Sequence, residues 1–499
     1  MPRSDNGGQK YTILLCFIRL WRLNRCENRY ENQTVFASFP KNELYCNPHK
    51  LCIKMNKSVA VFLLVAATLA TVSCDKTEQL FPKAPQTQTS PDDPDVPLPE
   101  NIFTDDFFVT FTDPVSGVVS YYLDSEAVEK DNSQTVYFNG CEMTNDERFL
   151  YALTSTNEEK IRLKQVSGSQ EKHGIIIDLA KRKMYRVPNP HGYPWIDPET
   201  DVFYYCTLSP DRTSATFYKR ELLVDPAKVI KLASIPASIV PTGVNKPLTR
   251  VVSHITLTSD KKKVFIDSWI ADQFIWGLLD LYTGAWEEWG HSPAVHITHG
   301  QLNPKHDNEA LCAVDAWDDR SGAHHPIEYD PDGTYPRLQF VKKGSRQTIQ
   351  PDPDNNNASH EGWCSDGDHI YWCSSGLHVR NIRDNSYKCL LRTTPGIDQV
   401  THCHPTKDMK YWTYDDNSPG YYRGCSWKVN FFNATNGKVI PIYSSRPQMN
   451  DANHESTLHP DPHPHFVCND KYIVCTVVGD DLNMHWSITP VAQLIEKTK

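Results

Sequence analysis

The sequence of 499 residues predicts an all-β fold, a seven-bladed β-propeller that follows a lipoprotein signal and a Pro-rich tether. Three observations predict it. The 35 Pro and 23 Gly mark many turns, and the 11% of aromatic residues favours strands. A pattern of turn and strand recurs seven times, and hardly any stretch has the periodicity of a long helix. Repeated four-stranded units of this kind form the blades of a propeller.

Residues 55–74 have the pattern of a bacterial lipoprotein signal. Lys57 supplies a short basic region, the apolar run 59–70 is too short to span a membrane comfortably, and modest side chains lead to Cys74. In such signals the cysteine becomes the lipidated first residue after cleavage. We therefore expect an exported bacterial lipoprotein lipidated at Cys74, either periplasmic or anchored at the outer membrane or cell surface. The alternative is a buried apolar strand.

The segments on either side of the signal differ in character. Residues 1–54 look like an over-extended gene start; they carry nine Lys/Arg and four Asp/Glu, so without them the formal charge changes from −10 to −15. Residues 75–100 contain six prolines and form the expected tether. The negative charge argues against a nucleic-acid binder. We expect a monomer that meets the membrane through its lipid anchor only.

The propeller is expected to span residues 101–499. Each copy of its repeat is an Asx turn followed by an apolar or aromatic strand. The copies lie at 144–154, 209–219, 258–269, 303–317, 364–375, 405–416 and 468–478. A strand–turn–strand pattern falls between them and also fits the leading segment 103–123, which we expect to supply the outer strand of the last blade. An array of β-sandwiches is the alternative, but it does not require two turn signals at every step.

Histidines recur at one position of this repeat. Counting back six residues from the turn gives Gly140, Tyr205, His254, His299, His360, His402 and His463. The position precedes the first strand of each blade, so the five histidines are predicted to gather at one mouth of a central channel. For any single histidine, the alternative is a structural role at the start of a strand.

The segment 454–466 adds further candidate ligands around His463. It contains His454, His459, Asp461 and His465 between prolines that stiffen the backbone. Imidazoles with a carboxylate suit a first-row divalent metal. The alternative is a solvated His-rich loop. Ten cysteines follow residue 74 without a CxxC pair, and we expect mainly buried thiols, although export permits disulfides.

Four segments resemble motifs of one enzyme family. The matches are His360, Glu361, Trp363, Asp366 and Gly367 in SHEGWCSDGDHIYW; Pro462, His463, Pro464 and Phe466 in HPDPHPHF; His299 and Pro304 in THGQLNP; and His402 and Asp408 in THCHPTKD. The family is that of the oligogalacturonate lyases, seven-bladed propeller enzymes of pectin breakdown. The resemblance spans residues 108–495.

The resemblance implies a site for a divalent cation, manganese, held by three His and one Gln. His360 and His463 match two of the His ligands, the third falls on Asp461, and the Gln falls on Leu458. We therefore assign His360, His463, Asp461 and His459 to the metal. His299 matches the family's base, and we assign the other two register histidines, His254 and His402, to substrate binding. The family's substrate-binding Arg should lie in or near residues 273–284, which contain none.

The chemistry expected of such a site is β-elimination. The reaction removes the C5 proton of a uronate beside the C6 carboxylate, whose charge a cation neutralises. A neutral histidine takes such a proton near pH 7. We predict a lyase for uronate oligosaccharides, above all oligogalacturonides. The alternatives are a lyase for another uronate glycan such as ulvan and a non-catalytic propeller that binds glycan or protein.

Overall fold

The computed structural model describes residues 98, 101–104, 106–128, 132–155, 173–188, 190–236, 239, 248–270, 273–292, 297–314, 317–318, 323–324, 337–349, 358–394, 397–416, 427–447, 461–481 and 483–499. The chain separates into two compact units. The larger unit, residues 95–318 with 323–499, contains every strand given below. The smaller unit, residues 1–94 with 319–322, lies outside the described residues.

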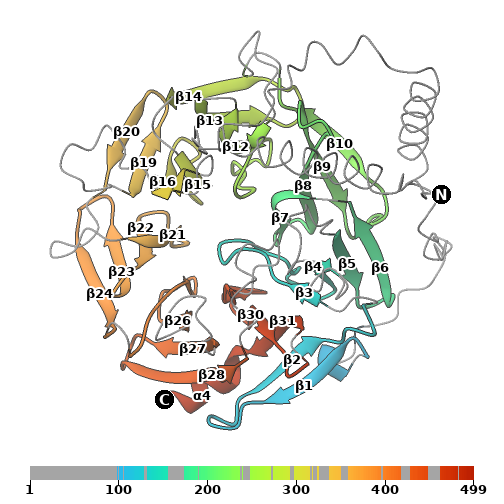
Figure 1. Cartoon of the computed structure of the whole chain (residues 1–499), viewed down its shortest axis with the longest axis vertical. Helices are drawn as coiled ribbons and strands as arrows, with labels where there is room; N and C mark the ends of the chain where they lie inside the picture. Colours follow the sequence, from blue (N-terminus) through green and yellow to red (C-terminus); the bar gives the residue numbers. More distant parts are fainter. Residues whose placement is uncertain are drawn as a thin grey trace, which may run out of the picture. The chain divides into compact units, whose positions relative to one another are not determined.

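Seven antiparallel sheets form the larger unit and confirm the predicted seven-bladed propeller. Blades 1 to 3 comprise β3 (Asn132–Gln134), β4 (Phe149–Ser155), β5 (His173–Asp178) and β6 (Lys183–Val187); β7 (His191–Asp197), β8 (Val202–Leu208), β9 (Ala215–Glu221) and β10 (Ile230–Ser234); and β11 (Leu248–Arg250), β12 (Lys263–Ile270), β13 (Gln273–Asp280) and β14 (Trp286–Ser292). Figure 1 shows these blades following one another around a ring.

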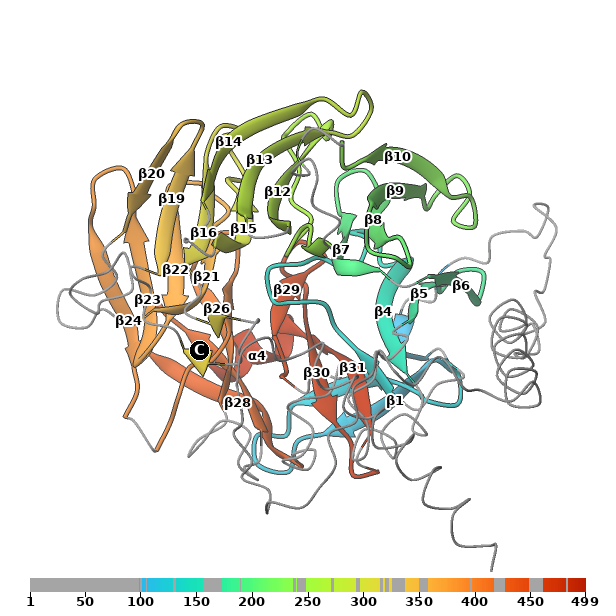
Figure 2. The same ribbon diagram turned by 45° about the horizontal axis from the view of Figure 1, so that its top comes forward.

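Blades 4 to 7 continue the ring (Figures 1 and 2). Blades 4 to 6 comprise β15 (Ile297–Leu302), β16 (Ala310–Val314), β19 (Leu338–Lys342) and β20 (Ser345–Thr348); β21 (Ser359–Trp363), β22 (His369–Cys373), β23 (Gly376–Asn381) and β24 (Tyr387–Arg392); and β25 (Cys403–Pro405), β26 (Tyr411–Asp416), β27 (Trp427–Asn433) and β28 (Lys438–Arg446). A short ribbon of β17 (Trp317–Asp318) and β18 (Ala323–His324) lies between β16 and β19 in sequence.

The last blade closes the ring with strands from both ends of the propeller. It contains β29 (His465–Val467), β30 (Tyr472–Val478), β31 (Met484–Pro490), β2 (Val119–Leu123) and β1 (Phe108–Thr112). Tyr121 pairs with Ile488 and Tyr122 with Ser487. The expected closure is confirmed, with two outer strands rather than one. The 3-10 helix η2 (Ile102–Thr104) precedes β1, and the helix α4 (Val491–Lys497) follows β31.

The core lies in the second and third strands of the blades. Every residue of β4, β16 and β30 is buried, whereas every residue of the outer strand β20 is exposed. A blade packs both faces against its neighbours, so its inner strands read as continuous apolar runs rather than as an alternation. This packing explains why the aromatic and β-branched residues concentrate in the repeat.

Six of the seven predicted turns join the first and second strands of a blade, and the copy at 209–219 does not. Residues 209–214 connect β8 to β9, the second and third strands of blade 2. The corresponding turn of that blade is 198–201, which follows Asp197 and contains an Asp201 with a positive φ of 55°. The predicted second copy therefore lies one strand too late in its blade, because both connections carry Asx turns.

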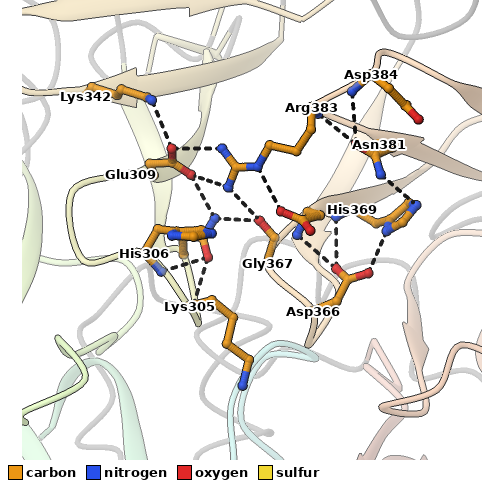
Figure 3. Close-up of polar contacts among 12 residues, drawn as sticks. Lys305, His306, Glu309, Lys342, Asp366, Gly367, His369, Asn381, Arg383 and Asp384 are labelled. Carbon is orange, nitrogen blue, oxygen red and sulfur yellow. Dashed lines mark hydrogen bonds and ion pairs between the residues drawn. The ribbon is translucent and has the colours of Figure 1, made fainter.

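Polar contacts between turns hold neighbouring blades together. They include Asn145 to Pro198, Ser259 to Asp307, Lys407 to Asp470 and Tyr472 to Glu147. An extensive contact joins blades 4 and 5 at Glu309 (Figure 3). Arg383 donates two hydrogen bonds to its carboxylate at 2.7 and 2.9 Å, Asn303 donates one at 3.2 Å, and Lys342 lies 2.9 Å from it.

The described cysteines are mainly buried thiols, as predicted. Seven of the nine are buried, and Cys141 and Cys389 are half-buried. Among the described residues no helix is both long and apolar enough to span a membrane. Residues 1–54, the signal with Cys74, and all of the tether except Leu98 lie outside the described residues, so those expectations stay predictions.

Candidate functional site

The five register histidines lie together in the middle of the ring. The imidazole centroids are 4.0 Å apart for His360 and His402, 4.3 Å for His402 and His463, and 5.7 Å for His254 and His299. Blades 3 to 7 contribute one histidine each, so residues far apart in sequence form one cluster. The repeat register predicted this meeting correctly.

A backbone irregularity directs three of these side chains. His299, His360 and His463 have positive φ values of 51°, 51° and 47°. The strand pairing shifts register around His299, between Thr298 and Gln301, and again in the next blade around His360. β-Bulges of this kind turn a side chain away from the alternation of its strand, and they are common beside functional sites. A left-handed backbone at a residue other than glycine is unfavourable, so the surrounding contacts must hold it.

Tyr137 fills the position that blade 1 contributes. Its ring centroid lies 4.6 Å from that of His463, 4.9 Å from His254, 5.5 Å from His299 and 5.9 Å from His402. Figures 1 and 2 show the loop after β3 extending toward the middle of the ring. Tyr137 is 6% exposed, and its hydroxyl has no hydrogen-bond partner among the described residues.

The register positions of blades 1 and 2 therefore need correction. Gly140 instead ends a turn, donating its N–H to the Tyr137 carbonyl, and Tyr205 is buried within β8. Tyr193 takes the place assigned to Tyr205, since its ring stacks on that of His254 at 5.5 Å. Tyr205 was wrong because the turn of blade 2 lies one connection earlier than predicted. Gly140 was wrong because blade 1 follows a long path between β3 and its turn.

His402, Asp461 and His463 form a candidate metal centre. One ligand atom of each lies within 4.8 Å of the other two, and all three residues are buried. Asp461 Oδ2 is 3.9 Å from His402 Nε2 and 4.0 Å from His463 Nε2. A buried carboxylate between two imidazoles is a donor set that fits a first-row divalent cation. The residues present therefore fit the metal that the sequence predicts.

Asp415 in β26 orients the imidazole of His402. Its Oδ1 accepts the backbone N–H of His402 at 2.8 Å, and its Oδ2 lies 2.9 Å from His402 Nδ1. The tautomer that donates Nδ1–H to this carboxylate leaves Nε2 as the electron-pair donor toward Asp461. Burial lowers the pKa of His402 well below its ordinary value, so the ring is neutral, as a metal ligand must be.

A second carboxylate supports His463. Glu142 Oε2 lies 2.6 Å from His465 Nε2, and His465 Nδ1 lies 2.8 Å from the carbonyl oxygen of His463. Burial opposes protonation of His465, but the Glu142 carboxylate outweighs it and raises the pKa of that imidazole. A protonated His465 donates at both nitrogens, and it anchors the left-handed backbone of His463 to blade 1.

The predicted division of ligands differs from the observed grouping. His402, assigned to substrate binding, lies with Asp461 and His463, whereas His360, assigned to the metal, packs against the His402 ring with Nδ1 2.9 Å from Ser359 Oγ. Burial lowers the pKa of His360 well below its ordinary value. His459 and Leu458 lie outside the described residues.

His299 is held by a charged pair. Its Nδ1 lies 3.3 Å from Glu361 Oε1 and 3.5 Å from Arg337 Nη2, and Arg337 Nε donates to Glu361 Oε2 at 2.8 Å. Burial alone would raise the pKa of Glu361, but Arg337 and His299 lower it well below its usual range. The His299 side chain is 23% exposed, in contrast to 1% for His402 and 4% for His463.

Arg337 is the charged site residue that the sequence did not reveal. The family resemblance predicts an arginine in or near residues 273–284, whereas Arg337 immediately precedes β19 in blade 4. The repeat makes no prediction for the residue before the third strand of a blade. Arg337 lies beside His299 only because of the fold. His254 also lies in the cluster; burial lowers its pKa well below the ordinary value, and neither ring nitrogen has a hydrogen-bond partner among the described residues.

Solved propellers resemble this chain in fold. An oligogalacturonate lyase from Vibrio parahaemolyticus is 14% identical with a TM-score of 0.57, and the match covers 77% of this chain and 96% of that one. An oligogalacturonate lyase in complex with manganese is 14% identical with a TM-score of 0.54 and the same coverage. No protein-family model and no curated protein matches the sequence. These likenesses show that the chain shares its seven-bladed fold with oligogalacturonate lyases.

Proposed function

We propose that this protein is a metal-dependent lyase that cleaves uronate oligosaccharides, above all oligogalacturonides, by β-elimination. One observation carries the proposal. A partly exposed histidine, His299, is paired with the buried carboxylate of Glu361, and the same ring of residues contains the His402, Asp461 and His463 group. The likeness in fold to oligogalacturonate lyases, one of them solved with manganese, supports the same reaction class.

His299 acts as the base in this reaction. In the tautomer that carries its proton on Nδ1, 3.3 Å from Glu361 Oε1, Nε2 is the nitrogen that takes the C5 proton of the sugar. The C5–H electrons form the C4–C5 double bond as the C4–O4 bond breaks, and the departing O4 takes a proton from water. Glu361 also stabilises the imidazolium that results, because its own carboxyl remains ionised beside Arg337.

Two further side chains contact the substrate in this proposal. Arg337 supplies positive charge beside His299, where an anionic sugar would otherwise meet a protein of formal charge −10. The Tyr137 hydroxyl donates a hydrogen bond to a substrate oxygen, since no described residue uses it. A divalent cation, manganese, held by His402, Asp461 and His463 would neutralise the uronate carboxylate and the charge that develops on it.

The test is product formation from digalacturonate in the presence of manganese, followed by the absorbance of the unsaturated uronate. We expect product from the wild type, and none after chelation of the metal. Polygalacturonate and ulvan fragments serve as competing substrates and identify the polymer. If no uronate yields an unsaturated product with metal bound, the lyase proposal is wrong.

The second candidate is a propeller that binds a glycan or protein without catalysis. Burial favours it, because His402, Asp461, His463 and Tyr137 are each at most 6% exposed. Such a protein would bind digalacturonate in calorimetry and leave it unchanged over hours.

We also propose that the chain is an exported lipoprotein, a monomer anchored through Cys74. Labelled palmitate incorporated by the wild type and not by Cys74→Ala would support this location. Unlabelled wild type recovered from a soluble fraction would overturn it.

A further inference from the structure

Two cysteines face each other across the boundary of blades 5 and 6. The Sγ atoms of Cys373 and Cys403 are 3.1 Å apart, and both residues are 0% exposed. Other described cysteines have backbone carbonyl oxygens as their hydrogen-bond partners: Cys141, Cys206, Cys389 and Cys468. Cys373 and Cys403 instead contact each other through their sulfur atoms.

The pair lies directly behind the histidine cluster. Cys373 ends β22 and pairs in register with Ser359, the neighbour of His360. Cys403 begins β25 and follows His402. The two strands belong to different blades, and the imidazoles of His360 and His402 are the histidines whose centroids lie 4.0 Å apart. A bond between these sulfurs would therefore fix the two blades where they carry the site.

The distance suits bond formation without rebuilding the fold. A disulfide is about 2.05 Å long, so the sulfurs must approach by roughly 1 Å. Both side chains lie in one apolar cluster with Tyr371 and Trp412. The two cysteines are 30 positions apart in sequence, and the bond would close the chain between them into a loop.

We propose that Cys373 and Cys403 form a disulfide that links blades 5 and 6. Both thiols lose a proton and together two electrons, and an S–S bond forms between them. The oxidant is a disulfide such as oxidised glutathione, which is reduced to two thiols. The reaction proceeds through a mixed disulfide and needs no other reactant.

The bond forms while the blades come together rather than afterwards. Burial raises the pKa of the Cys373 thiol well above its ordinary value, and a thiol that stays protonated attacks a disulfide slowly. A folded chain prepared under reducing conditions should therefore oxidise much more slowly than one that folds in the presence of oxidised glutathione.

The first test is peptide mapping of the full chain, exported into an oxidising compartment and alkylated in denaturant without reduction. The expected result is a linked peptide pair containing Cys373 and Cys403, with Cys364 of the same cluster alkylated. Alkylation of both Cys373 and Cys403, or a link from either one to another cysteine, overturns the proposal.

The second test compares melting temperatures with and without dithiothreitol. Reduction should lower the Tm of the wild type by roughly 3–6 °C, because the open loop regains its entropy when unfolded. Cys373→Ala/Cys403→Ala should lose this dependence on reductant, and the matched variant Cys364→Ala should keep it. A wild type whose Tm is the same in both conditions contradicts the link.

Discussion

Glu309 and Glu361, in neighbouring blades, both form buried ion pairs. The Glu309 pair stabilises the fold, whereas the Glu361 pair holds the proposed base. Glu309 is 4% exposed and Glu361 is 1% exposed, and each accepts hydrogen bonds from an arginine. Around Glu309 the donors are Arg383, which comes from blade 5, and Lys342 and Asn303 of its own blade 4. Around Glu361 one partner is His299, a partly exposed base.

The difference shows how a buried ion pair is put to use. Three donors satisfy the Glu309 carboxylate, so no charge is left to act on a substrate, and the network links blades 4 and 5. The Glu361 carboxylate shares its charge with a histidine that can accept a proton. A glutamate–arginine pair therefore contributes to stability at Glu309 and to reactivity at Glu361. Single substitutions can separate these two roles.

The largest expected effect is that of His299→Ala on catalysis. Loss of a general base lowers kcat by roughly 10²- to 10⁴-fold. The Tm should stay close to that of the wild type, because the side chain is partly exposed. His291→Ala, a change of an exposed histidine on β14, is the control and should keep full activity. Equal kcat values for the two variants would remove His299 from the mechanism.

Acid should destabilise the site before it affects the turns. Burial lowers the pKa of His254, His360 and His402, so the folded state resists their protonation while the unfolded state protonates below about pH 6.5. Stability present above that pH is lost as pH falls, by about 1.4 kcal/mol per pH unit for each histidine. His465, whose pKa is raised, responds at higher pH: its stabilisation grows as pH falls through its folded-state pKa toward 6.5 and stays constant below that, so it does not offset the loss from the three.

The carboxyls at the turns respond in a different range. The pKa of Glu309 is lowered from 4.5, with Arg383 and Lys342 outweighing burial, so its contribution is lost only at more acidic pH. Urea midpoints at pH 7.5, 6.5, 5.5 and 4.5 test this order. A midpoint that is constant from pH 7.5 to 5 would contradict the assignment of neutral, buried histidines.

Arg383→Ala should destabilise the propeller by about 2 kcal/mol and leave kcat unchanged. Removing one partner of a buried ion pair costs about 3–5 kcal/mol, and solvent around the 36% exposed Arg383 side chain reduces the effect. Lys343→Ala, which removes an exposed partner of Glu287, is the control and should change stability by about 0.5 kcal/mol or less. If Arg383→Ala folds fully but loses activity, the purely structural role of the Glu309 pair is wrong.

The smallest expected effect is that of Tyr137→Phe. The ring keeps its contacts with the histidines, and only the hydroxyl is removed. One lost hydrogen bond to the substrate lowers kcat/KM by about tenfold, with an unchanged Tm. Tyr193→Phe, the neighbouring phenol stacked on His254, is the matched control and should stay within about twofold of the wild type. Equal kcat/KM values for the two variants would contradict a hydrogen bond from Tyr137 to the substrate.

The repeat in the sequence predicted the ring because every blade must bury the same strands. It predicted that His254, His299, His360, His402 and His463 lie together. A fixed number of residues before the turn corresponds to the same place in each blade. The same count failed for blades 1 and 2, where an Asx turn also follows the second strand and where the path after β3 is irregular. There Tyr137 and Tyr193 occupy the expected positions.

The polar partners of the histidines lay beyond what the repeat could reveal. Arg337 precedes the third strand of its blade, and Glu142, 323 residues from His465 in sequence, reaches it only because blade 7 adjoins blade 1. Likewise, the grouping of His402 rather than His360 with Asp461 depends on side-chain direction. Such contacts follow from packing, and one-dimensional spacing does not contain them.

The closing of blade 7 has a consequence for how the chain is made. β1 and β2 pair with each other, but β2 finds its second partner only after β31 has left the ribosome. Ring closure is a contact of very long sequence separation, and such contacts slow folding. Until synthesis is complete, β1 and β2 present an unpaired edge, which makes this step the one at which chaperones and export machinery must protect the chain.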